Sequence, residues 1–545
     1  MSTRSFDELL TAEPGEATPQ RPPLDDDEPR GSRLDRWWQR LSPRVQSLLR
    51  WGAPAFVVVV AAVTRLWNLG HPRALVFDET FYVKDAWTLF NLGYEASWPS
   101  DANPLFEAGQ ADIFLTQASF VVHPPLAKWI IGLGMSVVGP DNPVGWRIST
   151  ALAGILAVVL LMVVAKLLLR STLLATLAGL LFAIDGNAIV MSRVALLDNY
   201  VMLFALAGFG AILLDRRWSA ERLAVWQLAR EKGGRSVDWG PALWRRPWLI
   251  AAGVAFGATA AVKWSGLYFL AAFAIYTLVV DALARRRAGI PFWLSGTVLK
   301  QAPTTFLLMV PVAVAVYLAS WTGWFVTDGG YNRQWADDEG NAWTGALSWV
   351  PHSLQSFWHF ETAVYEYHVG ENRPHAYQAN PLSWLFLVRP TSMYYQAVDA
   401  GTNGCVTLCG QSITGIANPF IWWAGTAAAF YLVYRLARYR EWRVGLVLTG
   451  LAAGYLPWLL YLNRTVFQFY TIAFEPYLIL SLVIAIGLLI GRPDNAAWRR
   501  VGGLRMLAVF LAIVVATSVF FWPLWTGMQL DYDYLAAHWW LPTWR

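Results

Sequence analysis

Long apolar stretches recur along this chain of 545 residues. A bilayer has a hydrocarbon core about 30 Å thick, so a helix needs roughly 20 apolar residues to cross it. Eleven segments approach that length, at 52–69, 147–169, 172–190, 195–214, 247–262, 265–283, 303–322, 418–437, 444–462, 469–490 and 505–522. Only 14% of the residues are charged, whereas a soluble domain carries roughly 25%. The sequence therefore predicts an all-α membrane protein with about eleven transmembrane helices.

Charged residues in the predicted loops orient these spans. Cytoplasmic loops carry an excess of Lys and Arg. Five arginines (Arg33, Arg36, Arg40, Arg44 and Arg50) precede the first span, which places the N-terminus in the cytoplasm. The predicted inner loops 215–246, 284–302 and 491–504 are rich in arginine, whereas the long outer loops, about 70–146 and 323–417, lean acidic. This alternation predicts a multi-pass plasma-membrane protein with an extracytoplasmic C-terminus.

The same map divides the chain into three parts. Residues 1–50 are predicted to form a cytoplasmic tail, largely disordered because its start is rich in Pro and acidic residues. Residues 51–525 form the membrane domain, and 526–545 an extracytoplasmic tail. The apolar run 123–138 is too short for a span, and counting it as one would invert the charge map. It is therefore predicted to lie along the outer surface, as is a second interfacial helix over 351–368.

Ionisable side chains collect on the predicted outer face, where a site can form. They are Asp78, Glu79, His123, Lys128, Arg147, Asp198, Lys263, His375 and Arg464. Charged groups at membrane depth are costly, so they are functional candidates by default. Structural alternatives remain open for some: Lys128 can snorkel to the interface, Arg193 can pair with Asp198, and Glu79 can orient a helix.

A site at the membrane edge suits a donor carried on a lipid. A lipid phosphate leaving group needs cations, which Arg147, Arg464, Lys263 or His123 can supply. A hydroxyl acceptor needs one carboxylate as general base, and repulsion between the adjacent acids Asp78 and Glu79 is expected to raise the pKa of one of them. One base and one displacement predict inversion at the sugar carbon. Paired acids can also hold Mg²⁺ or Mn²⁺, but two carboxylates alone are a weak pattern, so no cofactor is expected.

Cysteine content and net charge exclude other classes. The two cysteines, Cys405 and Cys409, lie in a predicted outer loop, where an oxidising exterior favours a disulfide over free thiols. The net charge of +5 is accounted for by inner-loop arginines and gives no nucleic-acid surface. The 32 tryptophans suit the aromatic belts of a membrane protein.

Several blocks in order resemble the protein O-mannosyltransferase family. They are VFDETFYVKDAW, VHPPLAKW, GWRISTALAGIL, SRVALLDNYVMLF, GATAAVKWSGLYFL, ENRPHAYQANPLSWLFLVRPTSMYY and NRTVFQFYTIAFEPYLIL. The resemblance covers about residues 55–525. It implies a GT-C fold glycosyltransferase that moves mannose from a polyprenyl phosphate to Ser or Thr hydroxyls of exported proteins. The loop 323–417 is too short for the β-trefoil MIR domain of eukaryotic members, so the chain resembles the actinobacterial type.

The resemblance also implies roles for individual residues. Asp78 matches the proposed catalytic base, and Glu79 its partner that helps to position the acceptor. Arg147 is expected, with Arg464, to contact the donor phosphate. His123, Asp198 and Lys263 match motif positions expected on the donor side. His375 is expected on the acceptor side, although His375-Ala376-Tyr377 stands where the family often has His-Pro-Tyr.

The expected partners are polyprenyl-phosphate mannose, an exported polypeptide, membrane lipid and the secretion machinery, with no metal ion and no nucleic acid. Two alternatives remain. One is a GT-C enzyme that uses another lipid-linked sugar or a glycolipid acceptor. The other is a transporter, which predicts broken spans in two matching halves and charges near mid-membrane, neither of which the sequence displays.

Overall fold

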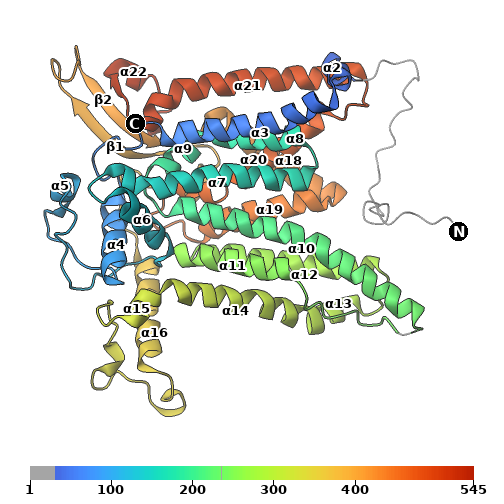
Figure 1. Ribbon diagram of the computed structural model, residues 1–545, viewed down its shortest axis with the longest axis horizontal. Coiled ribbons are helices and arrows are strands. Elements are labelled where there is room, and N and C mark those ends of the chain that lie inside the picture. The colour runs from blue at the N-terminus through green and yellow to red at the C-terminus, as the bar shows by residue number, and fades with distance from the viewer. Residues whose placement is uncertain (1–30, 235) are drawn as a thin grey trace.

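Long helices lie side by side along one axis in the computed structural model, which describes residues 31–234 and 236–545 (Figure 1). The helices of this bundle are α3 (Pro43–Leu66), α7 (Pro143–Leu169), α8 (Thr172–Ala183), α9 (Gly186–Arg193), α10 (Asp198–Lys232), α11 (Pro247–Val262), α12 (Gly266–Arg287), α14 (Ala302–Ser320), α18 (Pro419–Tyr439), α19 (Trp442–Tyr455), α20 (Glu475–Ile490) and α21 (Ala497–Thr526). Each of the predicted spans overlaps one or more of these helices.

Length and hydropathy set how many of these helices qualify as spans. Within the described residues, seven are long and apolar enough to cross a bilayer, and the pair α8–α9, bent by 60° at its break, raises the number to eight. Helices α11 and α20 are apolar but shorter. The multi-pass membrane fold is thus confirmed, while the count of about eleven spans stays a prediction.

Small residues let the central helices approach closely. Helix α10 is central: 83% of its most apolar stretch is buried, against 11% for α3. On α11, Gly253 and Gly257 face α14, where a β-carbon would lie within 2.8 Å of Met309 O and 2.6 Å of Ala313 Cα. This Gly-x-x-x-Gly spacing allows the two helix backbones to come into contact. In a bilayer the hydrophobic effect does not hold helices together, because lipid tails are equally apolar, so close packing of this kind stabilises the pair.

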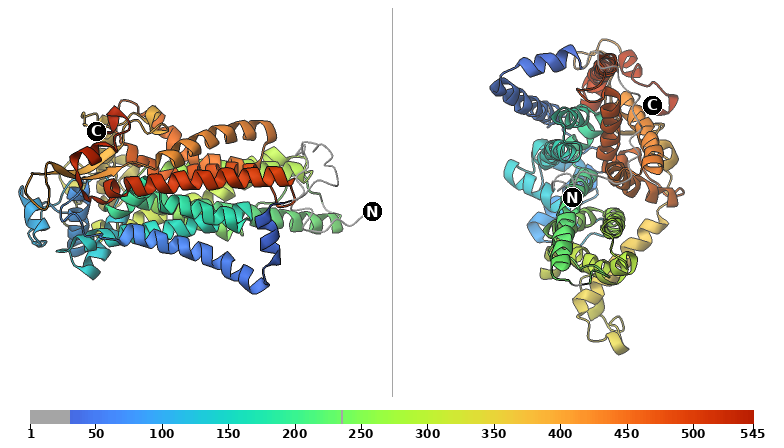
Figure 2. Two further views of the ribbon diagram at one scale, coloured as in Figure 1. Left: turned by 90° about the horizontal axis from the view of Figure 1, so that it is seen from above. Right: turned by 90° about the vertical axis from the view of Figure 1, so that its right-hand side faces the viewer.

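The remaining elements gather mostly at one end of the bundle and form an outer layer (Figures 1 and 2). They include α4 (Glu79–Leu92), α5 (Ala102–Glu107), α6 (Leu126–Val138), α15 (Thr322–Val326), α16 (His352–Gly370), α17 (Pro381–Trp384) and α22 (Tyr532–Ala536). Helices α4 and α16 run across the bundle axis (Figure 1). Helix α6 and helix α16 correspond to the two predicted interfacial helices.

Short helical turns connect these elements. They are η1 (Thr297–Gln301), η2 (Trp335–Asp337), η3 (Gly345–Leu347), η4 (Leu456–Leu460), η5 (Gln468–Ala473) and η6 (Pro542–Trp544), and the short helix α13 (Trp293–Gly296) precedes η1. Turns η4 and η5 flank the loop that carries Arg464. They replace the outer parts of two predicted spans, 444–462 and 469–490, so both spans are shorter as α-helix than predicted.

A small antiparallel sheet is the main departure from the predicted all-α fold. Strands β1 (Thr391–Val398), β2 (Cys409–Gly415) and β3 (Gln529–Asp531) pair in the order β1-β2-β3. Val398 pairs with Cys409, and Cys409 with Asp531. The predicted disulfide between Cys405 and Cys409 is present and closes the β1–β2 turn. β1 contains β-branched and aromatic residues, which favour a strand. The strand was not predicted, because the Gly- and Pro-containing segments on either side of it are typical of a loop.

Helical structure begins earlier than the predicted tail boundary at residue 50. Residues 1–30 lie outside the described residues. Helix α2 (Arg33–Arg40) starts at a capping box in which the Ser32 and Asp35 side chains bond each other's backbone N–H groups. Asp35 also pairs with Arg500 of α21 at 2.9 Å, which fixes α2 against the bundle.

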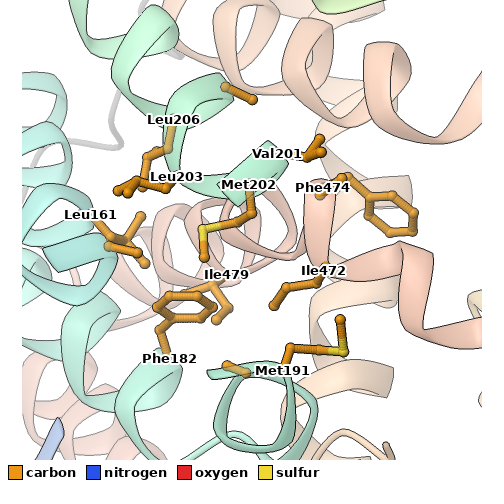
Figure 3. Close-up of a cluster of buried hydrophobic side chains, with 14 of the residues drawn as sticks. Leu161, Phe182, Met191, Val201, Met202, Leu203, Leu206, Ile472, Phe474 and Ile479 are labelled. Carbon is orange, nitrogen blue, oxygen red and sulfur yellow. The ribbon is translucent and has the colours of Figure 1, made fainter. Parts of the chain in front are cut away.

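An apolar cluster packs between helices of the bundle (Figure 3). Its buried members come from α7, α8, α9, α10, η5 and α20, and include Leu161, Phe182, Met191, Val201, Met202, Leu203, Leu206, Ile472, Phe474 and Ile479. Val201 and Ile472 follow Asp198 and Tyr470 by one helical turn or less. The cluster therefore anchors the elements that carry those two side chains.

Candidate active site

Asp78 lies at the start of α4, with its carboxylate free of any helix-capping role. The preceding residue, Phe77, adopts a left-handed conformation with φ of 52°. Its ring contacts the rings of Phe467 and Phe469 at 5.5 and 5.7 Å, which holds this strained turn in place. Asp78 occupies the N-cap but makes no side-chain capping bond. Its backbone is in the α region, with φ of −71° and ψ of −2°, whereas a capping residue is typically extended, so the carboxylate remains available for other contacts.

The surroundings of Asp78 hold its carboxyl near its titration point. Burial raises the pKa of Asp78 to about 6; Lys263 lowers this pKa, Asp198 raises it, and a hydrogen bond from Tyr82 lowers it. Repulsion from Glu79, the cause expected from sequence, is not among these. A base with a pKa near the working pH is well matched to proton transfer.

Lys263 and Asp198 form a buried ion pair beside Asp78. Lys263 follows α11 in extended conformation, and its Nζ donates to Asp198 Oδ2, at the start of α10, at 2.7 Å. Nζ also lies 4.9 Å from the centre of the Tyr470 ring. Arg193 does not pair with Asp198, the alternative considered above: its guanidinium donates to the carbonyls of residues 64, 65, 67 and 68.

Glu79 and Arg147 turn toward each other and away from the other charged groups. Arg147 Nε and Nη2 donate to the two Glu79 oxygens, each at 2.8 Å. Those oxygens also accept from the backbone N–H groups of Ala195 and Val76. The Arg147 Nη groups donate further to the carbonyls of Leu69, Pro72 and Ala74. Both side chains are fully buried, and their hydrogen bonds tie α4 to α7.

Arg464 reaches this region through two histidines. Its Nη2 lies 2.9 Å from His368 Nδ1. The His368 ring stacks on His123, with ring centres 5.3 Å apart, and His123 lies 6.0 Å from the Tyr82 ring. The charges of Arg464, Asp198 and Asp78 all act on the Tyr470 hydroxyl. Burial, followed by Lys263, lowers the pKa of His123 well below its usual value, so this ring is neutral at pH 7.

Two other predicted residues lie at the edge. His375 is exposed, and its ring contacts Phe77 at 5.9 Å and Phe467 at 5.0 Å. Lys128 does not snorkel: it is buried and bonds Glu95 at 2.8 Å, with Asp85 at 3.4 Å. Lys128 therefore joins α6 to α4 and to the segment that follows α4.

A narrow pocket adjoins the Lys263–Asp198 pair between α10, α12 and α19. Its walls include Asp198, Ser265, Tyr268, Phe269, Gly454, Trp458 and Tyr470. Leu456 and Leu460 of η4, beside this pocket in the chain, are exposed apolar residues. The free volume of this pocket is about 10 Å³, which is room for one water molecule and not for a sugar.

The structure thus brings together Asp78, His123, Asp198, Lys263 and Arg464 through chained contacts. It separates Glu79, Arg147 and Lys128 from them, and leaves His375 at the rim. Tyr82, Tyr470 and His368 were missed in the sequence. Tyr82 lies four residues after Asp78 on α4, a spacing that brings side chains together on one helix face. No comparable signal marks His368, whose partner is 96 residues away.

Comparison with known proteins matches both halves of the chain. Residues 55–230 match the family model described as dolichyl-phosphate-mannose-protein mannosyltransferase, and residues 353–544 match the C-terminal four-span region of protein O-mannosyltransferase. A Mycolicibacterium smegmatis protein named polyprenol-phosphate-mannose--protein mannosyltransferase is 32% identical over 506 residues, 91% of this chain and 93% of that protein. A Mycobacterium tuberculosis protein of the same name is 30% identical over 504 residues, 91% and 92% of the two chains.

Solved structures show the same fold. The Saccharomyces cerevisiae protein O-mannosyltransferase Pmt1-Pmt2 complex bound to its sugar donor has a TM-score of 0.68 at 16% identity, over 95% of each chain. The oligosaccharyltransferase AglB of Archaeoglobus fulgidus has a TM-score of 0.50 over 91% of this chain and 58% of its own. The fold is therefore that of the GT-C membrane glycosyltransferases. By sequence and by fold, the chain belongs to the protein O-mannosyltransferase family.

Proposed function

We propose that this chain transfers mannose from polyprenyl-phosphate mannose to Ser or Thr hydroxyls of exported polypeptides, with inversion at the sugar carbon. The observation that carries the proposal is the position of the Asp78 carboxylate, which makes no helix-capping bond and lies beside the buried Lys263–Asp198 pair. The curated relatives are named for this donor and for protein acceptors. One uncapped carboxylate gives one general base, as an inverting displacement requires.

The reaction is a single displacement at the anomeric carbon. The acceptor hydroxyl oxygen forms the new bond to that carbon, while its proton passes to Asp78. The bond from the carbon to the phosphate oxygen breaks, and polyprenyl phosphate departs with the electron pair. Because a phosphate monoester is stable as an anion at neutral pH, the leaving group needs positive charge and no proton.

Cations beside the pocket are placed to supply that charge. Lys263 lies against the ring of Tyr470, a residue of the pocket wall, and Arg464 approaches from the loop between η4 and η5. The exposed apolar residues Leu456 and Leu460 of η4 offer the lipid chain of the donor a contact from the bilayer side. His375, at the rim beside Phe77, lies on the acceptor side. In this proposal Glu79 and Arg147, which were expected to bind substrates, hold α4 in place, and so keep the Asp78 carboxylate beside Lys263 and Asp198.

The arrangement favours catalysis without a metal ion. Glu79 uses both oxygens on Arg147 and on two backbone N–H groups, so Asp78 and Glu79 do not form a joint carboxylate pair. The cations adjacent to Asp78 compete with a divalent ion for the same carboxylate. Transfer is therefore expected to persist in the presence of EDTA.

The site is assigned to the outer face of the plasma membrane. Arginine-rich ends of α10 and α12 lie at the end of the bundle opposite the outer layer, as the positive-inside rule requires (Figure 1). An acceptor then reaches Asp78 after export, which makes the secretion machinery a partner in supply.

The test is transfer by the purified chain in lipid nanodiscs, with labelled polyprenyl-phosphate mannose and a Ser/Thr-containing peptide. Replacing Asp78 by Asn is expected to reduce transfer at least about 100-fold, a typical loss for general base catalysis. Asp101→Asn is the matched control, because Asp101 also stands uncapped at a helix start, is exposed and lies away from the cluster. Undiminished transfer by the Asp78 variant, or product with the donor's anomeric configuration, would contradict the mechanism.

A further inference from the structure

Arg464 is held in an unusual way for a partly buried arginine. Among residues 31–234 and 236–545, no carboxylate lies within 4.0 Å of its guanidinium, whereas Arg147, Arg246 and Arg500 each pair with an acid. Its Nε is buried and has no hydrogen-bond partner in the described part of the chain. Its Nη2 is fixed by the imidazole of His368 at 2.9 Å. No acid in the described part of the chain neutralises this guanidinium, and its Nε remains free to donate to a ligand.

The His368 ring is held by hydrogen bonds at both nitrogens and by contacts with two neighbouring rings. Nε2 lies 2.7 Å from the carbonyl oxygen of Val122. Since Arg464 donates to Nδ1, the ring hydrogen is on Nε2 and is donated to that carbonyl. The ring stacks on His123 and meets the edge of Trp264 at 5.8 Å. Burial, followed by the charge of Arg464, lowers the pKa of His368 to about 4, so the ring stays neutral at pH 7.

The neutral His368 ring accepts a hydrogen bond from Arg464 and so fixes the orientation of the guanidinium without neutralising its charge. A carboxylate in the place of His368 would hold the guanidinium equally well, but it would neutralise the charge and compete with an incoming anion. The stack on His123 and the bond to Val122 transmit the rigidity of the first outer loop to α16. Arg464 lies in a loop, where a side chain of this length would otherwise sample several rotamers.

We infer that His368 is a positioning residue that aims Arg464 at the phosphate of the lipid-linked donor. This inference rests on the proposed function for the identity of the donor sugar. It needs only a lipid phosphate as ligand, and that phosphate is present both on the donor and on the lipid product. His368 itself touches neither substrate. Its contribution is to lower the entropy cost of binding the anion.

The test compares His368→Ala and His368→Gln with His359→Ala, a histidine of the same helix that stacks on Trp335 instead. Binding of polyprenyl phosphate and the KM for polyprenyl-phosphate mannose are measured together with kcat and the melting temperature. His368→Ala is expected to weaken phosphate binding and raise KM about tenfold, with a smaller change in kcat. His368→Gln restores much of both, because an amide can accept from Arg464 and donate to Val122. His359→Ala leaves all of these values unchanged.

Two results overturn the inference. One is unchanged phosphate binding in His368→Ala while Arg464→Gln loses it, since Arg464 would then need no support from the histidine. The other is a lowered melting temperature and kcat in both His368 variants with KM intact, which is the behaviour of a packing residue. Failure of the wild-type chain to transfer mannose would refute the proposed function, while phosphate binding still decides the role of His368.

Discussion

Replacing Glu79 by Gln separates a structural role for this acid from a catalytic one. Glu79 is 0% exposed and Arg147 is 1% exposed, and Glu79 accepts four hydrogen bonds. Glutamine keeps the shape but removes the charge and turns an NH₂ group toward donors. Breaking a buried ion pair from one side costs about 3–5 kcal/mol. With an unfolding entropy of about 2.1 cal/mol/K per residue, that loss lowers the melting temperature of a chain this long by about 3–4 °C.

The assay is thermal unfolding in one detergent, run in parallel with mannosyl transfer. Glu79→Gln and Arg147→Gln should each lower the melting temperature, and the double variant should lose less than the sum, because the two residues are directly coupled. Asp78→Asn is the neighbouring control. Since burial raises the pKa of Asp78, its charged form is unfavourable in the folded protein, and the Asn variant should melt at the wild-type temperature or above.

One outcome would refute this assignment. If Glu79→Gln melts like the wild type but no longer transfers mannose, Glu79 contacts a substrate, as the family resemblance first suggested. Loss of both stability and activity agrees with the scaffold role, provided that activity measured well below the melting temperature recovers in part.

Two further predictions concern the proton and the topology. Because the pKa of Asp78 is about 6, kcat/KM should fall as the pH drops through 6, and Asp198→Asn should move this acid limb to lower pH by removing a charge that raises the pKa; a limb that stays near the ordinary carboxyl value of about 4 would count against Asp78. The two native cysteines are joined, so an introduced cysteine is the sole free thiol among the described residues. An impermeant maleimide should label Glu339→Cys in intact cells and Lys232→Cys only after lysis; the reverse pattern would invert the map.

Much of the membrane fold could be predicted because hydropathy and charge are local in sequence. Each of the eleven apolar segments contains helical structure, and the short predicted run 123–138 contains α6 (Leu126–Val138). Turns η4 and η5 were not predicted, because apolar composition does not distinguish α-helix from tighter turns. The β1–β2 hairpin was missed because pairing depends on partners, and β3 comes from residues more than a hundred positions away.

The site was predictable as a group but not in its internal division. Asp78, Asp198, Lys263 and Arg464 were all predicted to lie on one face of the membrane, so the order of the spans alone brings them to the same end of the bundle. Which acid meets which cation is a tertiary fact: Glu79 pairs with Arg147 across 68 residues, and the adjacent Asp78 does not. His368 was not predicted as a site residue, because nothing near it in the chain indicates a contact with Arg464.

The sheet of the outer layer has a consequence for the order of synthesis. Strand β3 follows α21, and beyond it Trp544 donates to the carbonyl of Leu387, while Arg389 donates to the carbonyls of Thr543 and Arg545. The ribosome makes Trp544 157 residues after Leu387, and it makes β3 more than a hundred residues after β2, the strand with which β3 pairs. The hairpin must therefore wait, with one edge unpaired, until the last long helix has been inserted. A chain stalled before that point would present this edge outside the membrane, which gives a protease a simple mark of incomplete insertion.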